Sequence, residues 1–490
     1  MLSKQKPSGN FSRTHAVVKK VHLNVMGLVM PLVLLAGTAA LHAEQSLRVY
    51  PAPANEPLSS DFKVSINQTD APVYLAAVAT ADPKLRSRIS TGDTASFRDH
   101  TSFVSFDMDD RVTVTVTCPK PVESVKLLPS SSGITPVVDG NRVTFTIPKP
   151  QPLELEVNGD WVHGLQVFAN PMETNAPDSN DPNVIYFGPG IHHIQDLKVG
   201  SGKTVYVAGG AVVYGQANPA VHGGAVISLL GDNIVLRGRG VIDGSLCPLH
   251  TRNLLAITGT NVVLEGVVLR DSSTWTVPIR HSANVTVDDI KLFGYRGNSD
   301  GVDICNSRDV TVERSYLRTM DDLIVVKTPD RNGGESRDIE AKHCVLWNEL
   351  AHALSIGAEL RANVENVHFS DCDVIHDKGR EWLLRVYHCD AADVHNITFD
   401  NIRIEESRRL ISLWIGKAIW SRDAEPGHIE DVAFRDIRAV GPRPSIDLKG
   451  YDSDHIVRDT RFENVVINGK PLKLDQINRN AFVQDVRVEP

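Results

Sequence analysis

A short pattern recurs along the second half of the chain and constrains its fold more than any other feature. In segments such as NVTVDDIKL, DVTVERSYL and NITFDNIRI, an asparagine or aspartate precedes apolar residues at alternate positions. The apolar residue after this Asn or Asp serves as a register mark, and successive marks lie between 23 (285 − 262) and 35 (432 − 397) residues apart. The marks are Ile234, Val262, Val285, Val310, Ile339, Val367, Ile397, Val432 and, more weakly, Thr460. Repetition at this period indicates stacked structural units.

The alternation inside each unit indicates short strands, because residues two apart lie on one face of a strand. Few stretches between the units follow the 3.6-residue period of a helix. Units of roughly 25 residues that consist of strands and turns bury their apolar faces by stacking into a solenoid. The sequence therefore predicts an all-β chain in which residues 184–480 form a right-handed parallel β-helix.

The six cysteines are spread along the chain without a Cys-x-x-Cys pair. This spacing argues against a zinc site and against a small disulfide scaffold. Cys344 and Cys372 each lie five residues after a register mark, so we expect them to stack on adjacent turns, about 4.8 Å apart by strand spacing. Paired buried thiols are the expected state, and a disulfide is the alternative.

The N-terminal segment, residues 1–43, has five lysines and arginines, no acid, and the apolar run VMGLVMPLVLLAGTAAL. It predicts a signal peptide cleaved near Ala43 and a secreted or periplasmic protein. A membrane anchor is the alternative, but it would need a longer apolar run. Removing five positive charges changes the formal net charge from −9 to −14 (−9 − 5). An acidic chain is a poor candidate for binding nucleic acid, which requires a basic face.

Residues 44–170 have a different pattern. The segments FKVSINQT, RVTVTVTC and NRVTFTIP are short alternating strands separated by Pro, Gly and Asp turns, which predicts a small antiparallel β-sandwich. Residues 171–183 are rich in Pro, Asn and Asp and predict a linker to the β-helix.

Several charged residues of the repeat region, a histidine and a tryptophan lie at similar offsets from their register marks. The offsets are 13 for Trp275, 15 for Asp300, 11 and 12 for Asp321 and Asp322, 13 for His352 and 18 for Arg385. Residues at similar offsets on successive turns of a solenoid share one face. We therefore expect three carboxylates, a histidine and an arginine to meet in one groove, with the Trp275 ring placed to stack on a sugar.

This set of groups suits cleavage of a glycosidic bond, in which one acid protonates the leaving oxygen and one base activates water. Neighbouring carboxylates repel each other's charge, which raises the pKa of one so that it keeps a proton near neutral pH. A single aspartate is more often a turn residue that accepts local backbone N–H bonds. Three at matched offsets favour the catalytic interpretation.

The motifs NSDGVDI, MDD, AHALSIGAE and REWLLRVY resemble, in order and spacing, the four motifs of the polygalacturonase family, glycoside hydrolase family 28. The resemblance covers roughly residues 184–470. It implies a pectin-lyase-like β-helix that hydrolyses α-linked polysaccharide with inversion, without a metal or other cofactor.

By motif position the resemblance also implies roles for single residues. Asp321 would be the general acid, Asp300 and Asp322 the pair that holds the attacking water, and His352 the support of the acid. The substrate-binding residues would be Arg385, Tyr387, Trp275, Asn298, Glu359 and Lys327.

Two motifs differ from the family pattern. The usual Gly-His-Gly is Ala351-His352-Ala353, and the usual Arg-Ile-Lys is Arg385-Val386-Tyr387, so a tyrosine replaces the lysine expected to meet a uronate carboxylate. Tyrosine can hydrogen-bond and stack but is uncharged near neutral pH. The predicted sandwich and phrases such as LQVFANP and DVIHDKGREW also resemble the dextranase family, glycoside hydrolase family 49, so a neutral glycan is the alternative substrate.

Two further functions remain as alternatives to hydrolysis. A polysaccharide lyase uses the same architecture with calcium and an arginine base. A noncatalytic glycan-binding β-helix would need no matched carboxylates. In each case the partner is a polysaccharide or oligosaccharide, and the sequence gives no oligomeric state.

Overall fold

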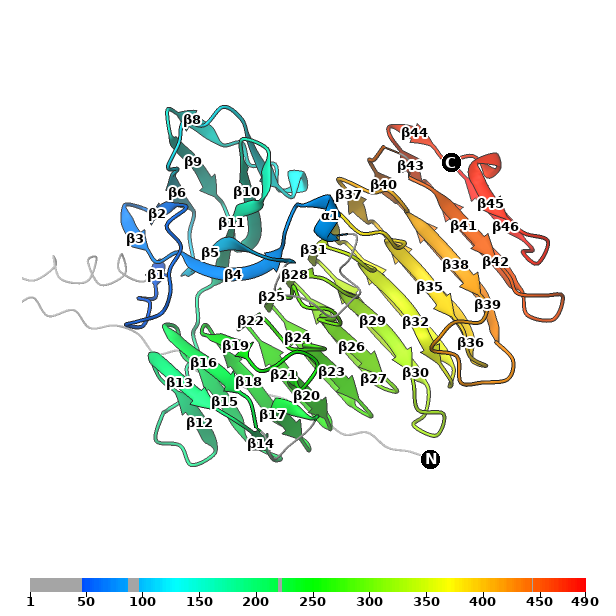
Figure 1. Ribbon diagram of the computed structural model, residues 1–490, viewed down its shortest axis with the longest axis horizontal. Coiled ribbons are helices and arrows are strands. Elements are labelled where there is room, and N and C mark those ends of the chain that lie inside the picture. The colour runs from blue at the N-terminus through cyan, green and yellow to red at the C-terminus, as the bar shows by residue number, and fades with distance from the viewer. Residues whose placement is uncertain (1–45, 87–96, 219–222, 443) are drawn as a thin grey trace, which may run out of the picture. The chain divides into compact units, whose positions relative to one another are not determined.

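The computed structural model describes residues 46–86, 97–218, 223–442 and 444–490 (Figure 1). The predicted signal peptide lies outside these residues. The described part contains no helix that is both long and apolar enough to cross a membrane. Its helical segments are short: α1 (Pro83–Arg86) and 3-10 turns at Ser130–Ser132 and Leu474–Gln476.

Three long sheets form a parallel β-helix, which confirms the predicted fold (Figure 1). As far as β43, each turn contributes one strand to each sheet, in chain order; β44 then pairs antiparallel with β43. Sheet 1 contains β12 (Val184–Phe187), β15 (Thr204–Val207), β18 (Ile234–Gly238), β21 (Thr260–Glu265), β24 (Ala283–Asp288), β27 (Arg308–Glu313), β30 (Ser336–Lys342), β33 (Val364–Ser370), β36 (Asp393–Asp400), β39 (His428–Arg435), β42 (Val457–Glu463) and β46 (Val486–Glu489).

Sheet 2 contains β13 (Gly190–Ile194), β16 (Ala211–Gln216), β19 (Val241–Leu246), β22 (Val268–Arg270), β25 (Lys291–Phe293), β28 (Tyr316–Thr319), β31 (Val345–Asn348), β34 (Asp373–Asp377), β37 (Arg403–Ile404), β40 (Arg438–Ala439), β43 (Val466–Ile467) and β44 (Lys470–Pro471). Sheet 3 contains β14 (Leu197–Val199), β17 (Ala225–Leu230), β20 (Asn253–Thr258), β23 (Val277–Arg280), β26 (Val302–Cys305), β29 (Ile324–Thr328), β32 (Leu354–Leu360), β35 (Leu384–His388), β38 (Ile411–Ile415), β41 (Ile446–Lys449) and β45 (Ile477–Arg479).

The register marks pair with one another along sheet 1. Ile234 lies opposite Val262, Val262 opposite Val285, and the pairing continues without a slip to Val432 and Thr460. The Asn or Asp before each mark has a left-handed backbone, with φ between 49° and 58°. Asn and Asp tolerate this conformation better than other residues with a side chain. The recurring Asn or Asp is therefore a corner of the solenoid.

Apolar side chains stack inside the β-helix, turn upon turn. Phe369, Phe399, Phe434 and Phe462 occupy one position on four successive strands, with ring centroids 4.9 to 5.1 Å apart. All four are fully buried. Cys344 and Cys372 also stack in the core as free thiols, so the expected thiol state is the one observed.

The N-terminal strands form two packed sheets with an apolar core between them. One sheet contains β1 (Leu47–Val49), β4 (Tyr74–Ala79), β5 (Arg98–Met108), β7 (Val125–Leu128), β10 (Gln151–Val157) and β11 (Asp160–Pro171). The other contains β2 (Lys63–Ile66), β3 (Thr69–Ala71), β6 (Val112–Thr117), β8 (Val137–Asp139) and β9 (Arg142–Ile147). The sandwich is antiparallel except where β11 pairs with β5 in parallel, a detail that strand alternation does not predict.

The sandwich packs against the outer face of sheet 2, and the two belong to one compact unit. Phe103 of β5 lies 5.5 Å from Phe293 of β25, and Phe168 of β11 lies 5.3 Å from Tyr316 of β28, between ring centroids. A buried aromatic pair adds about 0.5–1.5 kcal/mol beyond its area. The sandwich thereby covers one flank of the β-helix and leaves sheet 3 to carry polar groups.

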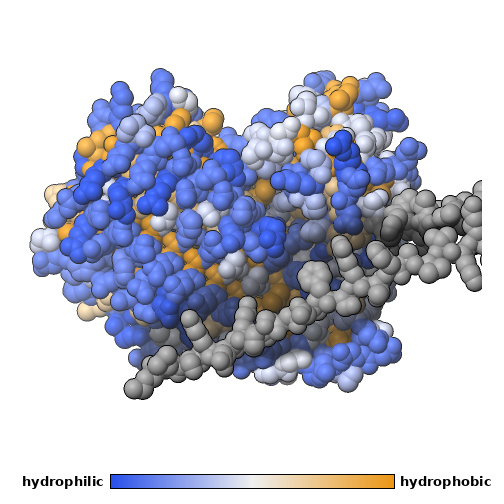
Figure 2. Space-filling view, turned by 180° about the vertical axis from the view of Figure 1, so that it is seen from behind, coloured by the Kyte–Doolittle hydropathy of each residue, from blue (hydrophilic) through white to orange (hydrophobic). Residues whose placement is uncertain are grey.

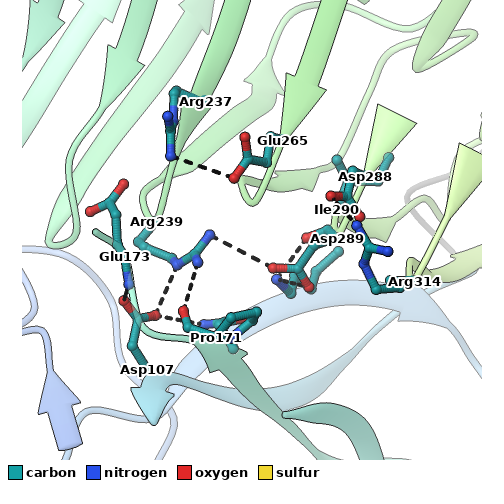
Figure 3. Close-up of polar contacts among 12 residues, drawn as sticks. Asp107, Pro171, Glu173, Arg237, Arg239, Glu265, Asp288, Asp289, Ile290 and Arg314 are labelled. Atoms are coloured by element: carbon teal, nitrogen blue, oxygen red, sulfur yellow. Dashed lines mark hydrogen bonds and ion pairs between the residues drawn. The ribbon is translucent and has the colours of Figure 1, made fainter. Parts of the chain in front are cut away.

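A buried ion network strengthens this interface (Figure 3). Arg239, in the turn after β18, donates from Nε to Asp107 Oδ1 of β5 at 2.8 Å and from Nη2 to the Pro171 carbonyl at 2.9 Å. Its Nη1 lies 3.7 Å from Asp289. Because Arg239 and Asp107 are both buried, removing either would leave an unpaired buried charge.

Hydrophilic residues cover most of the face seen in Figure 2, with hydrophobic residues showing between them in narrow strips. Such alternation is expected where each strand turns one set of side chains inward and the other outward.

Candidate active site

One position just before the strands of sheet 3 repeats on five successive turns. Val277, Val302, Ile324, Leu354 and Leu384 pair in sequence along this sheet. Two residues before them stand Trp275, Asp300, Asp322, His352 and Trp382. Backbone bonds carry the same register, including Gly301 N to Asp322 O at 2.8 Å and Leu323 N to His352 O at 2.9 Å. The structure thus brings together the residues that their offsets had grouped; we call this row the site ladder.

Asp321 joins the site ladder through a bend. Residues 320–323 lie outside the strands, between β28 and β29, and the Thr319 hydroxyl donates to the Asp321 carbonyl at 2.6 Å. On a regular strand, consecutive side chains would point to opposite faces. The bend removes this conflict, so the carboxylates of Asp321 and Asp322 both lie close to that of Asp300.

Gly301 is required by the close approach of two turns. A Cβ at this position would lie 2.3 Å from the Leu323 carbonyl oxygen and 2.8 Å from Leu317 Cδ2. These separations are too short for real atoms, so any side chain would push Asp300 away from Asp322. The glycine of the NSDG motif therefore sets the spacing of the two aspartates.

One carboxylate oxygen from each of Asp300, Asp321 and Asp322 lies within 4.8 Å of the other two. Asp300 and Asp322 are 2% and 8% exposed, whereas Asp321 is more accessible. Two oxygens at this separation can be bridged by one water, because each hydrogen bond spans about 2.8 Å.

Lys327 lies beneath this group and is 4% exposed. Its Nζ lies 3.2 Å from Asp300, 3.0 Å from Asp303 and 3.9 Å from Asp322. Among the described residues, no cation lies within this range of Asp321. Sequence comparison places Lys327 among substrate-binding residues, but its burial and its partners indicate an electrostatic role.

The pKa values separate the three carboxylates. Burial raises the pKa of Asp300, and Lys327 opposes the rise. Burial also raises the pKa of Asp322, to about 7, again against Lys327. Burial and then the charges of Asp300 and Asp322 raise the pKa of Asp321 well above its ordinary value. Asp321 is thus the carboxyl group that best keeps a proton, as a general acid requires.

His352 is neutral in this site. Burial, followed by the positive charge of Arg385, lowers the pKa of His352 to about 3. Its Nδ1 donates to the Trp382 carbonyl oxygen at 2.6 Å, so Nε2 carries the lone pair. Nε2 lies 4.0 Å from Asp322 Oδ1 and 3.5 Å from Arg385 Nη1. The resemblance implies that His352 supports Asp321, whereas the carboxylate it approaches here is that of Asp322.

Arg385 and Tyr387 lie on β35, one turn after His352. Arg385 Nη1 lies 3.1 Å from Glu381, and the guanidinium lies 3.9 Å from the Tyr387 ring centroid. Tyr387 also meets the edges of Trp414 and Trp420, at 5.0 and 5.8 Å between centroids. At the position of the expected lysine there is therefore an aromatic cluster, of which Trp420 is 42% exposed.

The other predicted substrate-binding residues lie around the carboxylates. Asn298 is exposed and donates from Nδ2 to Asp321 Oδ2 at 3.4 Å. The half-buried Glu359 raises the pKa of Asp322 through its charge. The half-buried Trp275 ring already has two cations against it, with Lys327 Nζ at 4.2 Å and Arg280 at 5.0 Å from its centroid.

Sequence reasoning missed Asp303, Trp382 and the Trp414–Trp420 pair. Asp303 is fully buried against Lys327, and it belongs to the same NSDGVDI motif as Asp300. Strand alternation would have placed it on the outer face of β26. Trp382 lies 15 residues after its mark (382 − 367), the same offset as Asp300, so a signal for it was available in the register.

Comparison with known proteins agrees with this geometry. The family model "Glycosyl hydrolases family 28" matches residues 197–479, which is 283 of 490 residues (479 − 197 + 1). No curated protein matches the chain.

Two solved structures share the fold. An exopolygalacturonase from Thermotoga maritima is 16% identical, with a TM-score of 0.52 over 62% of this chain and 83% of that one. Dex49A from Penicillium minioluteum is 14% identical, with a TM-score of 0.56 over 90% of this chain and 96% of that one. The second match is long enough to include the sandwich.

The family match spans the turns that carry the three aspartates, Lys327 and His352. A cluster of three carboxylates with different pKa shifts and a family model over more than half of the chain lead to one assignment: the chain belongs to glycosyl hydrolases family 28 and is a glycoside hydrolase.

Proposed function

We propose that the protein hydrolyses an α-linked polysaccharide or oligosaccharide, in the manner of a polygalacturonase, by a single displacement that inverts the anomeric carbon. The observation that supports this best is the convergence of three carboxylates within 4.8 Å, two of which, Asp300 and Asp322, lie 3.2 and 3.9 Å from the buried Lys327. Family membership favours hydrolysis over the lyase and the noncatalytic alternatives.

In the proposed step Asp321 donates its proton to the glycosidic oxygen as the bond to the anomeric carbon breaks. A water held between Asp300 and Asp322 attacks that carbon from the opposite side, and its proton passes to this pair. Lys327 keeps the pair ionised, because a nearby positive charge favours the carboxylate form. After hydrolysis, exchange with solvent removes the proton from the pair and supplies one to Asp321.

Inversion is a separate part of the proposal. Carboxyl groups about 5–5.5 Å apart are usual in retaining enzymes, whereas inverting enzymes more often have about 6.5–9.5 Å. We favour inversion because Asp300 and Asp322 share one cation and one water can bridge them. Proton NMR of the first product decides: an inverted anomer supports the single displacement, and a retained anomer contradicts it.

The first experiment is a reducing-sugar assay on polygalacturonate, rhamnogalacturonan, dextran and pullulan, with a chelator present and Asp321→Asn alongside. Release from one substrate that is lost in the variant supports the proposal. Products that absorb as unsaturated uronides would indicate a lyase. Glycan binding without turnover, equal in parent and variant, would indicate a binding protein.

A neutral glycan is the second candidate substrate class, and Tyr387 is the observation that favours it. Its ring and the neighbouring Trp414 and Trp420 offer stacking faces where a uronate carboxylate would need a cation. Dextran as the preferred substrate in the same assay would support this candidate over a galacturonan.

Export is also part of the proposal, and the basic and apolar residues before Ala43 support it. Cell fractionation with N-terminal sequencing of the mature protein tests it. A chain that keeps Met1 in the cytoplasmic fraction would contradict export.

A further inference from the structure

A second cluster of titratable side chains lies on the sandwich. β5 and β11 run side by side in parallel, with Ser102 opposite Leu165, which places His100 of β5 beside His163 of β11. Their ring centroids are 4.9 Å apart. Asp99 precedes His100 in the same strand. The three side chains are half-buried, and none of them takes part in the proposed hydrolysis.

Both histidines direct one ring nitrogen at the same carboxylate oxygen. His163 Nε2 lies 2.9 Å from Asp99 Oδ1, and His100 Nδ1 lies 3.5 Å from it. Zinc bonds to nitrogen and oxygen measure about 2.0–2.2 Å, so two ligand atoms of a tetrahedral site lie roughly 3.3–3.5 Å apart. Both nitrogen–oxygen separations are therefore close to those between two ligands of a tetrahedral site, and one ligand atom of each residue lies within 4.8 Å of the others.

The other nitrogen of each ring is held by a further carboxylate. His163 Nδ1 lies 2.8 Å from Asp160 Oδ2, and His100 Nε2 lies 2.8 Å from Asp61 Oδ2. Histidines that bind metals almost always donate their second N–H to a carboxylate, a carbonyl or water, which fixes the tautomer and the ring. Both rings of this cluster have that arrangement.

The hydrogen-bond partners of the two rings indicate which ring nitrogens carry protons. A neutral imidazole has one N–H, and the outer carboxylates Asp61 and Asp160 are placed to accept it. The inner nitrogens then present lone pairs to Asp99 Oδ1, which is also an acceptor. Three acceptors that face one another repel unless a cation lies among them, either protons on the rings or a metal ion.

We propose that Asp99, His100 and His163 form a binding site for a divalent transition metal of the zinc class, with solvent as a fourth ligand. Imidazole and carboxylate together suit this class of ion. Asp99 and His100 also line a cavity of about 480 Å³ between the sandwich and the β-helix, which gives access for the ion and for solvent. The site joins two neighbouring strands, so the bound ion should stabilise the sandwich.

Isothermal titration of the untagged, chelator-treated full chain with zinc chloride at pH 7.5 tests the proposal. We expect one site per chain that His163→Ala removes. The exposed outer residue gives a milder variant: Asp160→Asn should weaken zinc binding by about 10–100-fold. Zinc X-ray absorption should show nitrogen and oxygen ligands at about 2.0–2.1 Å.

His343→Ala is the matched control, since His343 is a half-exposed histidine that lies 3.9 Å from Asp371 on the β-helix. It should leave zinc affinity unchanged. Asp321→Asn distinguishes binding at the catalytic carboxylates, which it would weaken. The proposal is overturned if zinc does not bind, or if it binds equally well to the parent chain, Asp160→Asn and His163→Ala, with folding verified by circular dichroism.

Discussion

Side chains stack at one position on successive turns in two parts of the β-helix. Inside it is the row Phe369, Phe399, Phe434 and Phe462, which we call the interior row, and outside it is the site ladder. In the interior row, identical rings repeat about 5 Å apart and stabilise one another through contact alone. In the site ladder, the residue type varies along the turns, from tryptophan through two successive aspartates to histidine and again to tryptophan.

The difference shows what stacking in register requires of each kind of side chain. Apolar groups can repeat indefinitely, because burial next to a like group removes both from water. Carboxylates cannot, because burial and mutual repulsion both oppose their charge. The site ladder therefore needs Lys327 beneath it. Lys327 lies 3.2 Å from Asp300 and 3.9 Å from Asp322 and favours their ionised forms, whereas burial and these two charges raise the pKa of Asp321 well above its ordinary value.

The largest effect on the site ladder should come from Asp321→Asn. Loss of a general acid costs about 10²–10⁴-fold in rate. We expect kcat to fall within this range while the melting temperature changes little, in a reducing-sugar assay. Asp309→Asn is the matched control, because Asp309 is an exposed corner residue where asparagine is equally suitable. Unchanged kcat in Asp321→Asn would exclude its role as the acid.

In the interior row, Phe434→Ala should lower the free energy of unfolding by about 3–5 kcal/mol, because it removes a fully buried ring between two stacked neighbours. Urea denaturation measures this loss. The pH profile of hydrolysis should not move. If the profile moved as much as the stability, the two rows would not be independent.

Lys327→Met tests whether the charge of Lys327 keeps Asp300 and Asp322 ionised. The ionised pair must accept a proton, so activity should fall as the pH drops through the Asp322 pKa of about 7. An opposite charge nearby lowers a carboxyl pKa by about 1–3, so removal of the lysine should move this acid limb upward by about one to three pH units.

The profile of kcat/KM against pH measures the shift of the acid limb in Lys327→Met. Loss of activity at high pH reports deprotonation of Asp321, whose raised pKa must keep its proton. Lys342→Met, on a lysine paired with Glu340, is the control and should not shift either limb. An acid limb that stays in place in Lys327→Met would contradict the role of the lysine.

Tyr387→Lys should change substrate preference more than rate. A lysine at this position adds a charge that can meet a uronate, so we expect the ratio of activity on polygalacturonate to that on dextran to rise about tenfold, or about 1.4 kcal/mol. Tyr387→Phe keeps the ring and is the control for stacking. Equal ratios in all three proteins would show that Tyr387 does not face the substrate.

The smallest effect should come from a corner. Asn366 has a φ of 54°, and its Nδ2 donates to Asp338 at 3.0 Å. Asn366→Ala places an ordinary residue in a left-handed conformation and should cost about 1–2 kcal/mol, whereas Asn366→Gly should be nearly neutral. Denaturation midpoints of the two variants compare these costs directly.

Most of the fold was predictable because the residues that set its strand register recur visibly in the sequence. Each corner needs a residue that tolerates positive φ, and each following strand alternates, so the Asn or Asp and the mark recur together. The grouping of Asp300, Asp322 and His352 followed from the same offsets. The parallel pairing of β5 with β11 did not, because alternation is the same in both strand directions.

The electrostatics of the site could not be predicted in this way. Lys327 is one of many lysines in the sequence, and only the folded structure shows its Nζ among three carboxylates. The proximity of His352 to Asp322 rather than Asp321 likewise depends on the bend at residues 320–323.

The unequal spacing of the register marks has an evolutionary consequence. Sheet 1 keeps its pairing even where two marks are 35 residues apart, because the additional residues lie in the turns between strands. The turn after β38, which contains Trp420, belongs to this longest interval. On the proposed function, insertions and deletions there change the surface around Trp420 without disturbing the turns that hold the three aspartates, so substrate range and chemistry can evolve as separate traits.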